Sequence, residues 1–429
     1  MRILVIGGGG REHALCWVIK KSRPDAQIFC APGNAGIAEI ARCVQISPTA
    51  IADLTKFAIE QAIDLIVVGG ENSLAAGIVN HFEMHQLKIV GPNLAASRLE
   101  SSKVFAKQFM FRHNIPTARF QACESIDEAV GILKRGEFGD ENSSVVVKAD
   151  GLAAGKGVVV AQNRAEAIKA IEELMSENNA ASGAASRIVL EETLVGSEIS
   201  LLLFSDGRNY ALMPPARDHK RIGEGNTGAN TGGMGTITDE SLLTGEELKR
   251  IVTKIVEPTL AGALAEGFPF RGILFLGLMI NQGKANLLEY NVRFGDPEAQ
   301  SILVRLESDF VDICESIVDG KLDSTQIEFD HNSSACVIMA AEGYPAQPKT
   351  GDTINGLEKA IKHKDVVVFH SGTKKSDNNK ILTAGGRVLG VTASAMTLSD
   401  ALKKSYSAIG EISWDGAQFR RDIGRINLR

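Results

Sequence analysis

The sequence is organised around a glycine-rich turn between two valine-rich runs, in residues 145–160. Lys148 stands just before the turn and Lys156 lies within it. The β-branched residues on both sides predict two antiparallel strands. Small residues leave backbone N–H groups uncovered and a lysine adds a point charge, so the turn suits a phosphate group. Ordinary hairpins with solvated lysines share this pattern, so the stretch alone leaves both interpretations open.

A Walker phosphate loop is excluded at this turn. Such a loop needs Ser or Thr directly after its Gly-Lys pair to bind the metal, whereas Gly155 and Lys156 are followed by Gly157. The spacing from Gly151 to Gly155 is also one residue short of that pattern. We therefore do not expect a P-loop NTPase.

Length and composition predict a soluble α/β enzyme of several units. The 429 residues exceed the size at which one core keeps growing, so about two to four compact units are expected. A hydrophobic content of 44% with 43 glycines is typical of a turn-rich α/β protein. The net charge of −6 and the lack of a polybasic run argue against a general nucleic-acid binder.

The six cysteines are scattered without a Cys-x-x-Cys pair, so we expect reduced thiols rather than a zinc or redox site. The chain begins with a strand pattern instead of a signal sequence, and it has no long uninterrupted apolar run. These features predict a cytoplasmic protein that does not enter membranes.

The N-terminal hundred residues predict a Rossmann-like sheet. An apolar strand at 2–6 runs into four glycines and the start of a helix, and further strands are expected at 27–30, 65–68 and 88–90. A dinucleotide site is not expected, because Glu12 stands where the third glycine of that fingerprint belongs. The turn either offers N–H groups to an anionic ligand or only lets helix and strand pack closely.

The next stretch predicts a linking helix and a compact αβ module. Ser101 and Ser102 can cap a helix over 101–110, which places Lys103 in its first turn. The module follows over about 120–192, with a helix near 165–175 and a polar loop at 176–186 expected to be mobile. After a strand at 187–191, an acidic connection leads to Glu198. That connection either holds an adenine edge and ribose hydroxyls or is a solvated acidic turn.

Residues 218–235 contain six glycines and almost no apolar side chains. We expect a long loop that closes over a ligand, with disorder as the alternative. Its polar groups include Asp218, Lys220, Arg221 and Thr231.

A strand pair at 273–280 and 285–289 leads into a polar face. Strand alternation puts Glu289, Asn291 and Arg293 on one side, opposite Tyr290 and Val292. Carboxylate and amide oxygens suit magnesium, and arginine can bind anionic oxygens in a bidentate manner. A polar strand face with an internal ion pair is the alternative.

The last hundred residues predict a third, small α/β unit with strands at 335–340, 366–370 and 388–393 and a helix near 399–410.

In this order, the motifs resemble those of ATP-grasp ligases and, more closely, of the phosphoribosylamine–glycine ligase family, over essentially the whole chain. The residues that carry the resemblance are GGGREHA at 8–14, KADGLAAGKG at 148–157, DHKR at 218–221 and RFGDPE at 293–298.

The resemblance implies three parts: a Rossmann-like N-terminal substrate domain over 1–102, an ATP-grasp domain over 103–318 with the mobile module inside it, and a C-terminal α/β domain over 325–429. It also implies residue roles. Lys103 and Lys148 would hold ATP phosphates under a loop that includes Gly151, Gly155, Lys156 and Gly157, and Glu191, Glu192, Leu194 and Glu198 would bind adenine and ribose. Glu289 and Asn291 would ligate Mg²⁺ or Mn²⁺. The substrate residues would be Gly9, Gly10, Arg11, Glu12, Asp218, Lys220, Arg293 and Asp296, with Lys148, Arg293 and Asp218 taking part in catalysis.

The implied reaction joins glycine to 5-phosphoribosylamine, with ATP cleaved to ADP and phosphate through a glycyl phosphate, as a step of purine biosynthesis. The partners are then small molecules, and the protein is expected to be a monomer, with a weak dimer as the alternative. Another ATP-grasp carboxylate–amine ligase or a carboxylase is the second reading.

Overall fold

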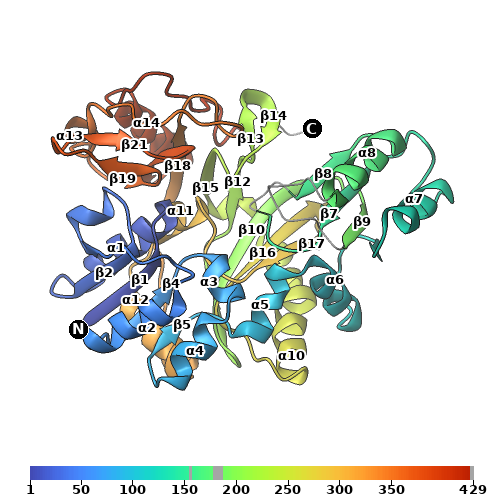
Figure 1. The fold of residues 1–429 in the computed structure, drawn as a ribbon, viewed down its shortest axis with the longest axis horizontal. Helices are drawn as coiled ribbons and strands as arrows, with labels where there is room; N and C mark the ends of the chain where they lie inside the picture. The colour runs from blue at the N-terminus through green and yellow to red at the C-terminus, as the bar shows by residue number, and fades with distance from the viewer. Residues whose placement is uncertain (154–156, 177–186, 426–429) are drawn as a thin grey trace.

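The computed structural model describes residues 1–153, 157–176 and 187–425 (Figure 1). The central prediction is confirmed, because β7 (Val145–Ala149) pairs antiparallel with β8 (Val158–Ala161). Gly155 and Lys156 lie outside the described residues, as does the polar loop after Ser176.

The N-terminal unit is a five-stranded parallel sheet in the order β3-β2-β1-β4-β5. Its predicted strands are confirmed, and the four glycines end β1 and begin α1. The elements are β1 (Arg2–Gly7), α1 (Gly10–Ser22), β2 (Gln27–Pro32), β3 (Arg42–Cys43), α2 (Ile51–Glu60), β4 (Leu65–Val68), α3 (Glu71–Ala75), α4 (Ile78–Met84), β5 (Ile89–Val90) and α5 (Leu94–Ser101).

A long antiparallel sheet forms the centre of the molecule. Its order is β17-β16-β10-β12-β15-β18-β22-β19, with β11 paired to β10. Its first part and the neighbouring helices are β10 (Ser197–Asp206), β11 (Tyr210–Leu212), β12 (Ala216–Asp218), β15 (Gly235–Thr238), α9 (Gly245–Ile251), α10 (Glu257–Ala265), β16 (Arg271–Asn281), β17 (Lys284–Asn291), α11 (Glu298–Leu303) and α12 (Phe310–Asp319).

The C-terminal strands extend this same sheet. The predicted α/β unit is present, but β15 pairs with β18, from Gly235 opposite Val337 to Thr238 opposite Ser334, so β18, β22 and β19 belong to the long sheet, whereas β20 and β21 pair only with each other. Because β15 and β18 pair with each other, neither of these two strands is an exposed sheet edge. The unit comprises β18 (Ser333–Ala340), α13 (Leu357–Ala360), β19 (Val366–His370), β20 (Thr373–Lys375), β21 (Ile381–Thr383), β22 (Arg387–Ala395) and α14 (Leu398–Ile409).

A small four-stranded sheet in the order β6-β9-β7-β8 projects beside β17 (Figure 1). Its apolar face packs on two helices in a core of its own, which corresponds to the αβ module expected from the sequence. The linking helix α6 precedes it and is capped by Ser102, whose hydroxyl accepts from the Phe105 N–H. The elements are α6 (Lys103–Arg112), β6 (Phe120–Cys123), α7 (Ile126–Lys134), α8 (Arg164–Met175) and β9 (Ile188–Glu192).

The expectation of an irregular loop over 218–235 is corrected by the structure. Asp218 ends β12, Gly235 begins β15, and between them β13 (Arg221–Gly223) and β14 (Thr227–Asn230) form a hairpin. The sequence of this hairpin shows no apolar alternation, because all four residues of β14 are exposed. Instead, buried Arg420 donates to the carbonyl of Arg221 and to Asn226 Oδ1. Its closing over a ligand stays a prediction.

All six cysteines are free, and five of them are buried. In the described part of the chain, helices of the length and apolarity needed to cross a membrane do not occur.

Two buried histidines join the N-terminal and C-terminal units. The His370 backbone N–H donates to His13 Nδ1 at 2.8 Å, so His13 must be neutral to accept this bond. Burial lowers the pKa of His13 to about 3, with His370 adding to the effect, and burial lowers the pKa of His370 to about 4.

We predict that this contact makes the fold sensitive to acid. Each pKa is lower in the folded state than in the unfolded chain, so the stabilisation is complete above about pH 6.5 and is lost as the pH falls below it. For His13 alone the free energy of unfolding should drop by about 2 kcal/mol between pH 7.5 and pH 5. Urea denaturation at both pH values measures the drop.

The matched variants are His13→Asn, whose amide oxygen can replace Nδ1 as acceptor, and His85→Asn on the exposed surface. His13→Asn should show a smaller loss between the two pH values than the parent protein, whereas His85→Asn should match the parent. An undiminished loss in His13→Asn contradicts the assignment.

Candidate active site

Glu289, near the end of β17, lies among four cations. Burial opposes ionisation of this carboxyl, but the surrounding positive charges outweigh it and lower its pKa below the usual value. Asn291 follows on the same strand, and its Oδ1 accepts from Arg293 Nη2 at 3.2 Å. The four cations, contributed by four different segments, are Lys220, Lys148, Lys103 and Arg293.

Lys148 reaches this place from β7 of the small sheet. Its Nζ donates to the Leu288 carbonyl at 3.4 Å and forms an ion pair with Glu191 Oε1 at 2.9 Å. The other carboxylate oxygen of Glu191 pairs with Lys107 Nζ at 3.0 Å. Because Leu288 adjoins Glu289, the hydrogen bond from Lys148 joins the small sheet to the edge of the long one.

The base of the glycine-rich turn is attached to the start of α6. Lys103 Nζ donates to the Gly151 carbonyl at 2.8 Å, and Asp150 Oδ1 accepts from the Val104 N–H at 3.2 Å. Gly151 has φ +112° and free space around its Cα, so a glycine is required there by backbone conformation rather than by crowding. Burial lowers the pKa of Lys103, although nearby carboxylates oppose the shift.

Arg293 is held by two carboxylates of the N-terminal unit. Its Nη2 pairs with Glu100 at 2.7 Å and its Nε with Glu71 at 3.1 Å. Since Nη2 also donates to Asn291, these two acids fix the orientation of an amide next to Glu289.

The glycine turn at the start of α1 already has anionic partners. The Gly9 N–H donates to Glu12 Oε2 at 2.5 Å, and Arg11 Nε pairs with Glu12 Oε1 at 2.7 Å. Arg11 also donates to the Phe294 carbonyl at 3.0 Å. Asp296 pairs with Arg387 at 3.4 Å. Burial opposes ionisation of Asp296, but the positive charges of Arg387 and Arg11 outweigh it and lower the pKa of this carboxyl. A ligand phosphate would therefore share this turn with protein carboxylates.

Asp218, at the end of β12, carries a buried oxygen, Oδ1, without a hydrogen-bond partner among the described residues. Burial and the nearby Glu298 raise its pKa well above the usual value. Two residues on, Lys220 pairs with Glu198 at 2.6 Å. Burial opposes the charge of Lys220, but Glu198 and Glu289 outweigh it and raise the pKa.

The structure thus brings Lys103, Lys148, Gly151, Glu191, Glu289 and Asn291 together, and Arg293 connects them to Arg11 through Glu71. Glu192 points elsewhere, because its carboxylate accepts from the Arg119 N–H at 2.8 Å. Leu194 is half-buried in the connection between β9 and β10, and Gly157 packs closely against Ala153.

Sequence reasoning gave no role to Lys107 or Glu100, and it indicated Glu71 only by its place after a strand. Lys107 lies four residues after Lys103 on α6, a spacing that places two side chains on one helix face and could have indicated it. Glu71 directly follows the turn after β4, where parallel sheets bind ligands. Nothing in the local sequence indicates Glu100.

The oxygen donors fit magnesium that carries a nucleotide. Within the described ranges, groups of three or more His, Cys, Asp or Glu side chains able to enclose a metal ion do not occur. Glu289 and Asn291 offer a carboxylate and an amide oxygen, and magnesium is commonly held by one or two protein oxygens together with phosphates and water.

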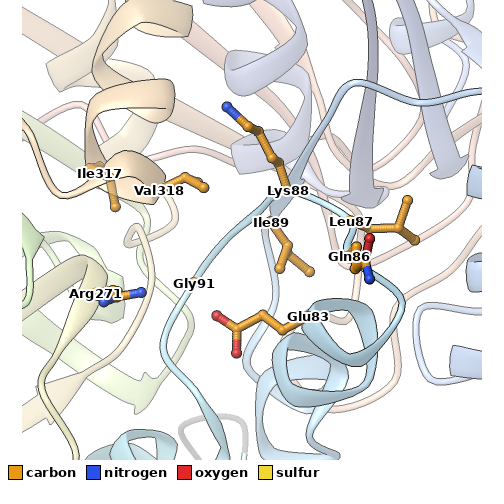
Figure 2. A pocket seen from close by; sticks show the side chains of 9 residues that line it. All are labelled: Glu83, Gln86, Leu87, Lys88, Ile89, Gly91, Arg271, Ile317 and Val318. Atoms are coloured by element: carbon orange, nitrogen blue, oxygen red, sulfur yellow. The ribbon is translucent and has the colours of Figure 1, made fainter.

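A cavity of about 160 Å³ lies elsewhere, between α4, β5, β16 and α12 (Figure 2). An ion pair between Lys88 and Asp319 at 3.1 Å is formed at this junction. None of the predicted site residues lines the cavity, so it is not the site described above. The lining residues are Glu83, Gln86, Leu87, Lys88, Ile89, Gly91, Arg271, Ile317 and Val318.

Comparison with known proteins identifies the family. Sequence models of phosphoribosylglycinamide synthetase match along the chain, with the N domain at residues 1–100, the ATP-grasp domain at 101–299 and the C domain at 334–426. The chain belongs to this family. The resemblance inferred from the motifs is confirmed.

Individual members of the phosphoribosylglycinamide synthetase family match over nearly their full lengths. The chain is 45% identical to the phosphoribosylamine–glycine ligase of Salmonella typhimurium over 429 residues, which covers 99% of this chain and 98% of that protein. The crystal structure of phosphoribosylamine–glycine ligase from Thermotoga maritima matches with a TM-score of 0.84 and 31% identity, covering 98% of this chain and all of that one.

The fold is shared more widely than the family. The biotin carboxylase domain of 2-oxoglutarate carboxylase from Hydrogenobacter thermophilus, crystallised with ADP, magnesium and bicarbonate, matches with a TM-score of 0.72 at 18% identity, covering 97% of this chain and 91% of that one. At that identity the match shows the fold alone. Together with the match to the Thermotoga structure, it confirms the predicted fold class.

We predict that Lys148→Ala and Glu289→Ala each lower kcat/KM for ATP by about 100- to 1,000-fold, because the first removes a cation expected to hold phosphates and the second a carboxylate expected to hold the metal. Steady-state ADP release measures the loss, and circular dichroism checks the fold. The control is Lys56→Ala, an exposed lysine paired with Glu60 on α2, which should stay near parental activity. Near-normal turnover in either site variant contradicts the assignment.

Proposed function

We propose that the protein is an ATP-dependent ligase that joins glycine to 5-phosphoribosylamine and yields glycinamide ribonucleotide, ADP and phosphate. The observation that supports this most directly is the set of four cations around Glu289, next to Asn291, in a member of the phosphoribosylglycinamide synthetase family. Lysine and arginine side chains in such a set can bind the phosphate oxygens of a nucleoside triphosphate. The reaction is a step of purine biosynthesis.

In the first step a carboxylate oxygen of glycine attacks the γ-phosphorus of ATP, ADP leaves, and glycyl phosphate forms. Lys103 and Lys148 hold the phosphates, and the loop of residues 150–158 covers them. Arg293 binds the transferring phosphate. The backbone from Glu191 to Leu194 holds the adenine edge, with Glu198 at the ribose. Catalysis here is positioning and charge stabilisation, because phosphoryl transfer needs no protein nucleophile.

In the second step the amine of phosphoribosylamine attacks the acyl carbon, the bond from that carbon to the phosphate oxygen breaks, and phosphate leaves. The attacking nitrogen must lose a proton. Asp218 suits this task, since its Oδ1 has no other partner among the described residues and its pKa is raised by burial and by Glu298. Gly9, Gly10, Arg11, Glu12, Lys220 and Asp296 complete the substrate site.

Glu289 and Asn291 would hold Mg²⁺ or Mn²⁺, which supplies positive charge to the phosphate oxygens. Arg293 holds Asn291 in place, because its Nη2 donates a hydrogen bond to Asn291 Oδ1. We further propose that the protein acts in the cytoplasm as a monomer on small molecules; six free cysteines are usual in a reducing compartment.

The reaction is tested by ADP release in the presence of Mg²⁺, with glycine alone, freshly generated phosphoribosylamine alone, and both. We expect rapid release only with both substrates, with labelled glycine appearing in a phosphorylated product. Full release with bicarbonate or another carboxylate in place of glycine would instead support a different ATP-grasp ligase or a carboxylase. Chelation of the metal should abolish release, and Mg²⁺ or Mn²⁺ should restore it.

A further inference from the structure

We propose that Lys107 is a positioning residue of the ATP site: it neutralises Glu191, so that Lys148 keeps its positive charge for the nucleotide phosphates. This inference rests on the proposed function and deepens it. It concerns a residue that touches neither nucleotide nor metal and acts through Glu191.

The Glu191 carboxylate is shared between two lysines. Its Oε2 pairs with Lys107 Nζ at 3.0 Å and its Oε1 with Lys148 Nζ at 2.9 Å. The exposed fractions of the three side chains are 3% for Lys107, 2% for Glu191 and 7% for Lys148, so water screens these charges little.

Charge balance explains why two lysines are present. Two cations and one carboxylate leave a net charge of +1, and this excess lies on the side of Lys148, whose Nζ also reaches the Leu288 carbonyl beside Glu289. Without Lys107, Glu191 and Lys148 would form a neutral pair. The phosphates would then face one positive charge fewer at short range, where such charges interact strongly.

Lys107 is held firmly in this role. Its Nζ donates to Thr117 Oγ1 at 2.6 Å, and this hydroxyl donates to the Leu287 carbonyl of β17 at 2.6 Å. The ammonium is therefore attached to the strand that carries Glu289 while it binds Glu191 on the small sheet. Lys107 thus also fixes the small sheet at the edge of the long one.

The primary test is ATP binding measured by calorimetry in the presence of Mg²⁺, which does not depend on turnover. Lys107→Met should weaken ATP binding by about tenfold or more, and Lys107→Arg, which keeps the charge, should stay within about threefold of the parent. The matched control is Lys134→Met at the exposed end of α7, which should bind ATP as the parent does.

The double variant Lys107→Met with Glu191→Gln is decisive. It removes both charges of the outer pair, leaves the charge of Lys148 and keeps the backbone of Glu191. The proposal predicts ATP binding within about threefold of Glu191→Gln alone, because Lys107 acts only through the charge of Glu191, and better binding than that of Lys107→Met alone. The double variant has no unpaired carboxylate, so the prediction holds even where Lys107→Met fails to fold. A double variant that binds ATP as weakly as Lys107→Met, or more weakly, overturns the proposal.

Steady-state kinetics separates this proposal from the proposed function. The loss in Lys107→Met should fall on KM for ATP, with KM for glycine within about twofold of the parent. A parent protein that binds ATP but does not join glycine to phosphoribosylamine would refute the proposed reaction and leave the role of Lys107 standing. A parent that does not bind ATP would overturn both.

Discussion

The site depends on the balance between a few buried carboxylates and the cations that surround them. Glu289 stays ionised because four cations lower its pKa, and Glu191 is shared between Lys107 and Lys148. An unpaired buried charge is costly, so each carboxylate fixes the elements that carry its partners. In this way charge pairing holds β7, β9 and α6 against β17, and the same charges remain available to a metal and to phosphates.

The second contribution comes from the N-terminal unit. Glu71 and Glu100 hold Arg293, and Arg293 holds Asn291, so the unit that carries the predicted substrate turn also orients a predicted metal ligand. Coupling of this kind suits a reaction in which an acyl phosphate must meet the amine before water reaches it. One hydrophobic core also runs from the N-terminal sheet through the long sheet to the C-terminal strands.

Much of this could be predicted from local sequence. Valine-rich runs with a small-residue turn predicted the β7–β8 hairpin, and alternation along β17 separated Glu289 and Asn291 from buried Tyr290. The rest depends on contacts between distant residues. Glu100 meets Arg293 across nearly two hundred residues of chain, and no local pattern encodes that meeting. The β13–β14 hairpin was expected as a loop because only Ile222 of its described residues packs on a hydrophobic cluster, whereas hydrogen bonds from distant Arg420 attach it to the rest of the chain.

The most direct test of the account follows the carboxylate oxygen of glycine. Glycine labelled with ¹⁸O in both carboxylate oxygens would be incubated with ATP, Mg²⁺ and phosphoribosylamine, and the released phosphate would be analysed by mass spectrometry. If ATP activates the carboxylate as glycyl phosphate, each phosphate carries one ¹⁸O atom, because the attacking oxygen leaves with phosphorus. Phosphate without ¹⁸O, formed at the rate of the ligated product, would contradict the account.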